Sequence, residues 1–208
     1  MDIHKPKLAH SLREFLAEIG TITVGILIAL GLESAVEAYH NRRLVDRARI
    51  ELRAELRSNR DTLADTISQE KKASVPLAAL LAYGRARLQG RPARLAPDLQ
   101  LNMRFVQMST AGWDSALATQ ALVHMPYDQA HALSVAYAGT RVFNDYEADA
   151  TRHWMELNTW PDDPGTLSHD QLQAAVHELA LNQGYQQSLI ASGAHLLLAY
   201  DKAIAALR

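Results

Sequence analysis

The longest apolar stretch of the chain lies near its N-terminus. Residues 15–36 read FLAEIGTITVGILIALGLESAV, a pattern that puts apolar side chains on every side of a helix. At roughly 1.5 Å per residue such a helix is about 33 Å long, close to the thickness of a bilayer core. The uncharged centre, residues 19–32, is shorter than a typical span, so a buried core helix and a cleaved signal peptide are alternatives. We expect a transmembrane helix over 15–36, after a short N-terminal tail of residues 1–14.

One face of this predicted span carries small residues at four-residue intervals. These residues are Ala17, Thr21, Gly25 and Ala29. Small side chains let two membrane helices approach closely, so the stripe predicts packing against a second copy or another membrane protein. The alternative is that small residues are simply common in membrane helices.

A long charged amphipathic helix is predicted over residues 37–75. Its apolar positions recur at steps of three, four and seven residues and form a narrow seam, made of Val45, Ala48, Leu52, Leu56, Asn59, Leu63 and Ile67. In a coiled coil, the polar Asn59 would fix the register and the number of strands. The alternative is a single helix that packs on its own downstream domain, and the sequence favours neither.

Residues 76–208 show helical periodicity without sustained alternation, so we expect a helical bundle domain and no sheet. Ser168 and Gln171 form a capping-box pattern at the start of the last helix. The expected helices are 77–88 (opened by Pro76), 98–108, 113–124, Pro126 towards Trp160, and 168 to about 207. The fold class is therefore all-α: a transmembrane helix that continues into a long amphipathic helix, then a bundle.

Composition and sequence motifs exclude several classes of functional site. The chain has no cysteine, which excludes disulfides and thiolate metal sites, and its net charge of -2 argues against a nucleic-acid partner. It has no phosphate-cradling loop, no dinucleotide fingerprint, no G-x-S-x-G and no H-E-x-x-H. Its histidine pairs at 124/131 and 169/177 lie too far apart to share one metal ion. We expect no catalytic residue, no cofactor and no metal site.

Aromatic residues gather in the central part of the domain. Trp113, Tyr137 and Trp154 would either line a pocket for a small apolar ligand or supply the bulk of the bundle core.

Two blocks of sequence suggest a relationship. REFLAEIG and VGILIALGLESAVE contain the pattern E-I-x(4)-V-G-I-L-I-A-L, carried here by Glu18 and residues 24–30. TAGWDSALATQALVHMPYDQAHALSVAY is similar to a W-x-x-A-x-x-T/S-G-A-L block, with Gln120 at the glycine position. The chain resembles an uncharacterised family of bacterial single-pass membrane proteins with a helical soluble domain. This resemblance implies a membrane anchor and a helical domain, and no catalytic activity.

Together these features predict a non-enzymatic scaffold or accessory subunit that is anchored in the bacterial inner membrane and acts by protein–protein interaction. The expected partners are the lipid bilayer and either a second copy or another membrane protein. The alternative is an anchored sensory domain that binds a ligand in an aromatic-lined pocket. Because a short basic leader before a first span usually stays inside, we expect the soluble domain in the periplasm.

Overall fold

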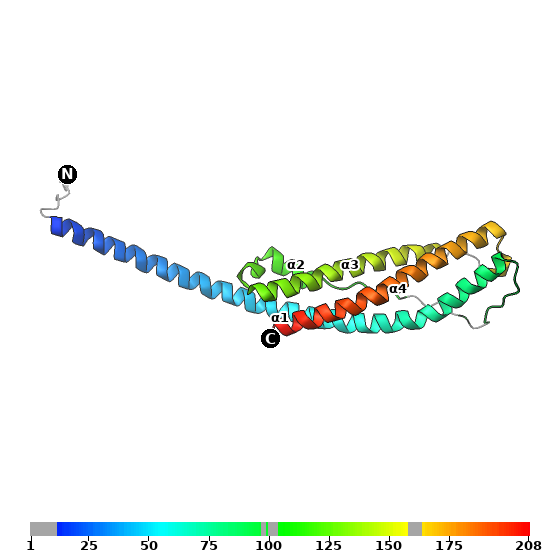
Figure 1. Ribbon diagram of the computed structural model, residues 1–208. Helices are drawn as coiled ribbons and strands as arrows, with labels where there is room; N and C mark the ends of the chain where they lie inside the picture. The colour runs from blue at the N-terminus through cyan, green and yellow to red at the C-terminus, as the bar shows by residue number, and fades with distance from the viewer. Residues whose placement is uncertain (1–11, 97–98, 100–103, 158–163) are drawn as a thin grey trace, which may run out of the picture. The chain divides into compact units, whose positions relative to one another are not determined.

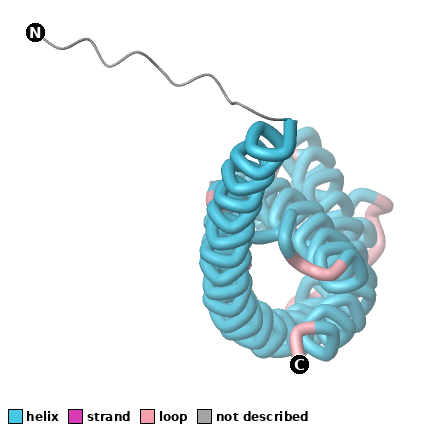
Figure 2. Tube along the Cα trace, turned by 90° about the vertical axis from the view of Figure 1, so that its left-hand side faces the viewer, coloured by secondary structure: helices cyan, strands magenta, loops and turns pink. Residues whose placement is uncertain are grey.

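All regular structure in the described part of the chain is helical. The computed structural model describes residues 12–96, 99, 104–157 and 164–208, and within these ranges no strand occurs (Figure 2). The helices are α1 (Leu12–Leu88), α2 (Ala111–Ala118), α3 (Tyr127–Leu157) and α4 (His169–Ala206), with two short 3-10 helices, η1 (Ala121–His124) and η2 (Pro164–Thr166). The predicted all-α class is confirmed.

The chain divides into two compact units within α1. Unit 1 is Met1–Arg47 and unit 2 is Ala48–Arg208. The described part of unit 1 is a single helix. Unit 2 contains the rest of α1 together with α2, η1, α3, η2 and α4, and it holds most of the buried core.

In unit 2, α4 runs antiparallel to α1 (Figure 1). Arg60 of α1 forms an ion pair of 2.6 Å with Asp201 near the end of α4. Leu81, 21 residues further along α1, packs in a cluster with Leu179 in the first third of α4. Because α3 and α4 are consecutive antiparallel neighbours, α3 runs in the same direction as α1. A long connection, residues 89–126, must therefore return along the bundle.

Pro76 does not begin a helix, as the sequence suggested, but lies inside α1. Proline has no N–H to donate to the carbonyl of residue 72, and its ring presses on the preceding turn, so it bends a helix that tertiary packing holds together. In unit 2, α1 curves through this stretch and continues to Leu88 (Figure 1).

The helix predicted over 98–108 is also wrong in its described part. Residues 104–110 are not helical, and residues 98 and 100–103 lie outside the described ranges. Two asparagine side chains make the backbone bonds of this segment. Asn144 of α3 accepts from the Met108 N–H at 2.9 Å and donates to its carbonyl at 3.0 Å. Asn59 of α1 pairs in the same way with Ser109, at 3.0 and 2.7 Å. These four bonds satisfy the backbone without a helix and fix the segment between α1 and α3.

The start of α4 confirms the predicted capping box. Ser168 Oγ accepts from the Gln171 N–H at 3.3 Å, and Gln171 Oε1 accepts from the Ser168 N–H at 2.9 Å. The helix predicted over 113–124 is instead two pieces. Helix α2 ends at Ala118 and η1 begins at Ala121, because Gln120 between them adopts a left-handed backbone with φ 60°. Glycine adopts this conformation without strain, which is a physical reason for a glycine at this position of the W-x-x-A-x-x-T/S-G-A-L pattern.

We therefore expect Gln120→Gly to raise the free energy of unfolding by about 0.5–1 kcal/mol, because it removes left-handed strain from a non-glycine residue. Gly90, at φ +66°, is the matched control with the opposite sign. Gly90→Ala should lower the free energy of unfolding by about 1 kcal/mol. The readout is denaturant unfolding of the full-length protein in detergent, followed by tryptophan fluorescence, which reports on unit 2 because residues 113, 154 and 160 lie there. A loss of stability in Gln120→Gly would contradict the assignment.

Candidate functional site

The predicted helix seam is part of the core of this single chain. Its members are buried, with no more than 8% of any residue exposed: Val45, Ala48, Leu52, Leu56, Asn59, Leu63 and Ile67. In unit 2 the seam lies against α4, where a Cβ added to Gly193 would stand only 2.9 Å from Ile67 Cδ1. Asn59 is occupied by the backbone of Ser109. Between the two interpretations of the seam, the geometry of unit 2 corresponds to a helix that packs on its own downstream domain.

The carboxylate of Glu55 joins three segments of unit 2. Tyr137 of α3 donates its hydroxyl to Oε1 at 2.6 Å. Ser109 Oγ and the Gly112 N–H donate to Oε2 at 2.6 and 2.9 Å, and the backbone of Trp113 donates as well. Gly112 lets the carboxylate approach, since a Cβ there would stand 3.2 Å from Oε1. Burial by itself raises the pKa of Glu55, but the hydrogen bonds donated to it outweigh that effect and hold the pKa below its ordinary value.

The three aromatic residues singled out in the sequence do not form one pocket. Trp113 and Tyr137 are buried and stack at 4.9 Å with an interplanar angle of 20°. Trp154 is only partly buried and follows Tyr137 by 17 positions on α3, about 25 Å along the helix axis. Burial raises the pKa of Tyr137, and its hydroxyl bond to the Glu55 carboxylate raises it further. In this geometry Trp113 and Tyr137 are core residues.

Replacing Glu55 with Gln should lower the free energy of unfolding by about 2–3 kcal/mol at pH 7, because one amide oxygen cannot accept what two charged oxygens accept. Glu51→Gln, one turn earlier on the exposed side of α1, is the control and should change little. Since the folded pKa of Glu55 lies below its ordinary value, its contribution is complete above about pH 4.5 and is lost as the pH falls through the folded pKa. The measurement is denaturant unfolding between pH 7 and pH 3. Equal stability of the two variants at pH 7 would show that the carboxylate does not join the segments.

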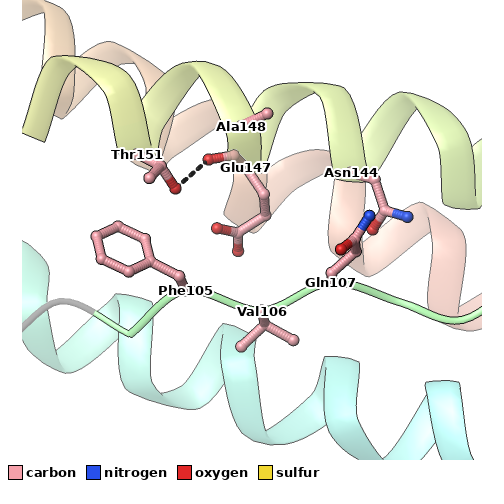
Figure 3. A pocket seen from close by; sticks show the side chains of 7 residues that line it. All are labelled: Phe105, Val106, Gln107, Asn144, Glu147, Ala148 and Thr151. Carbon is pink, nitrogen blue, oxygen red and sulfur yellow. Dashed lines mark hydrogen bonds between the residues drawn. The ribbon is translucent and has the colours of Figure 1, made fainter.

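A cavity of about 390 Å³ lies between α3 and the extended connection. Figure 3 shows it from close by, with the Glu147 carboxylate directed from α3 towards Phe105 and Val106. The other lining residues are Gln107, Asn144, Ala148 and Thr151. The walls thus combine apolar groups with one acidic group.

Glu147 is a buried carboxylate with a raised pKa. Only 5% of the residue is exposed, and its Oε1 has no hydrogen-bond partner among the described residues. Burial, and then the charge of Glu70 on α1, raise the pKa of Glu147 from 4.5 to about 7. Near neutral pH the group therefore exchanges a proton, and its charged form favours a cation beside it.

A second buried acid lies on the facing helix. Glu70 is 5% exposed and accepts a 2.9 Å hydrogen bond from Gln186 Nε2 of α4. Beside it is a cavity of about 10 Å³ that Asn182 also lines, which is room for roughly one water molecule. Gln186 Oε1 has no partner among the described residues. The middle of the bundle thus carries a polar layer with more acceptors than donors.

Sequence reasoning missed this polar layer. Glu147 was not singled out from the sequence, where it alternates with two other acids, Asp145 and Asp149. The available signal was the helical spacing, because Glu147 follows the buried Thr140 and Phe143 by seven and four positions and so shares their face of α3. Of the acids on α3, the one in register with the core is the one that is buried.

Glu147→Gln should remove a pH dependence of stability. Because the folded pKa of about 7 lies above the ordinary 4.5, the protein loses stability as the pH rises from about 4.5 to 7, by up to about 3 kcal/mol. The variant should be more stable than the unsubstituted protein above pH 7 and should show a flatter profile. Asp145→Asn, an exposed acid on the same helix, is the control. The measurement is the thermal midpoint from pH 5 to pH 8.5, and parallel profiles for all three proteins would contradict the pKa shift.

In unit 1 the small-residue stripe is exposed. Ala17, Thr21, Gly25 and Ala29 are all exposed, and a Cβ added to Gly25 would meet no atom within 4 Å. The Thr21 hydroxyl donates to the Ala17 carbonyl at 2.9 Å, so it needs no external partner. The large apolar side chains around the stripe are exposed as well, among them Leu16, Leu27 and Ile28.

Two helices of the described residues are long and apolar enough to cross a membrane. In the most apolar 18-residue stretch of α1 no residue is buried. In the corresponding stretch of α4, 28% is buried inside the protein. Helix α4 already uses its apolar face in the core of unit 2, where Leu189, Leu196 and Tyr200 are buried. The apolar side chains of α1 over residues 15–36 have no such cover.

No family model, curated protein or solved structure matches this chain. The resemblance carried by Glu18, residues 24–30 and the Trp113 block remains a prediction from the sequence.

Proposed function

We propose that the protein is a single-pass membrane anchor with a helical scaffold domain, and that it acts by protein–protein interaction rather than by catalysis. The observation that carries this proposal is the uncovered apolar helix of unit 1. Its side chains over residues 15–36 are exposed on all sides, and water is a poor solvent for such a surface. A bilayer covers all sides of the helix at once.

The self-association part of the proposal rests on the stripe of Ala17, Thr21, Gly25 and Ala29. Lipid tails give apolar helices no hydrophobic reason to pair, so close backbone approach along small residues is the usual driving contact. The stripe is exposed along its length and is free of intrachain contacts at Gly25. The proposed partner is a second copy of this span or the span of another membrane protein.

The proposed location is the bacterial inner membrane, with unit 2 in the periplasm. The basic residues Lys5, Lys7 and Arg13 precede the span, and basic residues beside a span usually stay inside. The arginines that follow the span are the opposing signal, but long domains translocate largely regardless of charge.

Gly25→Ile should weaken self-association of the full-length protein by about tenfold or more, because the larger side chain separates the two helix backbones. The measurement is the monomer–dimer equilibrium in detergent micelles by energy transfer between labelled chains, at several protein-to-detergent ratios.

Gly31→Ile is the matched control. Gly31 lies six positions after Gly25, about 120° around the helix, and it too has no atom within 4 Å of an added Cβ. The control should associate like the unsubstituted protein. An identical effect of both substitutions, or no association in any of the three proteins, would overturn self-association through the stripe.

One observation favours a second function, a ligand-binding domain. The 390 Å³ cavity is of the size that small-molecule sites have, and the Glu147 carboxylate gives it a directed polar group. Its walls include Phe105 in place of the three aromatic residues expected from the sequence. The two functions differ in where a variant acts: substitutions at Gly25 impair the scaffold, and substitutions that fill the cavity impair the ligand-binding domain.

A further inference from the structure

Three side chains that can ligate a metal converge between α3 and α4. They are His153 and Glu156, one turn apart on α3, and Glu178 on α4. One ligand atom from each lies within 4.8 Å of the other two. The pair His153 Nδ1 and Glu178 Oε2 is separated by 3.0 Å. This group is distinct from the cavity at Glu147 and from the stripe in unit 1.

From this arrangement we infer that the protein binds one divalent first-row transition ion, best matched by Zn²⁺, between α3 and α4. An imidazole nitrogen and carboxylate oxygens are ligands that Zn²⁺ accepts at about 2.0–2.2 Å. Ligand atoms around such an ion lie roughly 3.3 Å apart in a tetrahedral site, close to the 3.0 Å already present between His153 and Glu178. Three protein ligands leave a fourth position for water, the arrangement of an open zinc site.

The surroundings restrain His153 and Glu178 before an ion arrives, whereas Glu156 is exposed. The Tyr185 ring stacks on the imidazole of His153 at 5.1 Å, which limits rotation of the ring. The His153 and Glu178 side chains are only 22% and 19% exposed, so the ion would be partly shielded from water. Helix α3 lies beside α4 (Figure 1), and all three ligands stand on these helices rather than in loops.

A dication can take the place of the proton that joins His153 and Glu178. The hydrogen bond between His153 and Glu178 needs a proton on Nδ1, and a metal ion in its place satisfies the nitrogen and two carboxylates together. Binding of a metal ion at Nδ1 should therefore release that proton. Calcium and magnesium fit less well because they prefer oxygen ligands throughout.

The test is a titration of the full-length protein in detergent, first treated with a chelator, with Zn²⁺ alone by calorimetry and with Co²⁺ alone by visible absorption. We expect one ion per chain, a rise of the thermal midpoint with Zn²⁺, and Co²⁺ bands of a protein-ligated ion. His153→Ala and Glu178→Gln should each weaken Zn²⁺ binding by more than about tenfold, since even partners outside the ligand set cost about 10–100-fold.

His177→Ala is the matched control, because His177 neighbours Glu178 in the chain but is exposed on another face of α4. It should bind Zn²⁺ like the unsubstituted protein. Thermal midpoints without metal identify any variant that fails to fold, and Glu178→Gln provides a second variant if His153→Ala does so. The inference is overturned by the absence of saturable binding, or by equal Zn²⁺ affinity in His153→Ala, Glu178→Gln and the control.

Discussion

The arrangement of unit 2 depends on one carboxylate. Glu55 lies on α1, but the groups that donate to it belong to the connection, to the start of α2 and to α3. A single partly buried charge thus holds together segments up to 82 residues apart. The Glu55 carboxylate also satisfies the Gly112 N–H. This group lies at the start of α2, where backbone N–H groups have no partner within the helix. The stacked ring of Trp113 then covers Tyr137 and closes the site.

The connection between α1 and α3 is the second consequence of the topology. Two helices that run in the same direction require a long return, and the part of it at Met108 and Ser109 lies between α1 and α3. Asn59 and Asn144 bind its backbone from opposite sides with paired amide bonds. This explains why a polar residue occupies the seam of α1: Asn59 supplies hydrogen bonds to a peptide group that no helix or strand provides for. Further along the bundle lies a polar layer in which Glu70 and Glu147 are both buried. It contains fewer hydrogen-bond donors than acceptors.

Much of the fold could be predicted from the sequence, and the errors have physical causes. The seam of α1 and the capping box of α4 are local patterns, and local patterns predict helices well. Pro76 predicted a helix start because proline is favoured in the first turn of a helix and disfavoured inside one. In the structure α1 continues through it, with buried residues before and after, Ile67 and Leu77. The segment around Met108 has helical composition, but its conformation is decided by Asn144, 36 residues away. Nothing local in the sequence indicates such a pairing.

The same limit applies to the candidate sites. His153 and Glu156 are one turn apart and so visible in the sequence, but the third ligand, Glu178, lies on another helix and the sequence does not place it there. Glu147 differs from its acidic neighbours only in its register with Phe143. Pairings between distant helices, rather than residue types, distinguish these positions from ordinary surface acids.

Side chains of α1 contact residues far along the chain, and this has a consequence for the synthesis of the protein. The buried leucines of α1 leave the ribosome long before the helices that cover them. Three side-chain contacts of α1 show the separations, which are 82, 116 and 141 residues: Glu55 with Tyr137, Glu70 with Gln186 and Arg60 with Asp201. Until the last helix is made, α1 exposes an apolar face over most of its length in unit 2. Contacts this far apart make folding slow and leave the nascent chain open to aggregation in the meantime. Unit 2 thus completes its folding only once α4 has been made, and a chain cut short before α4 would expose an uncovered seam.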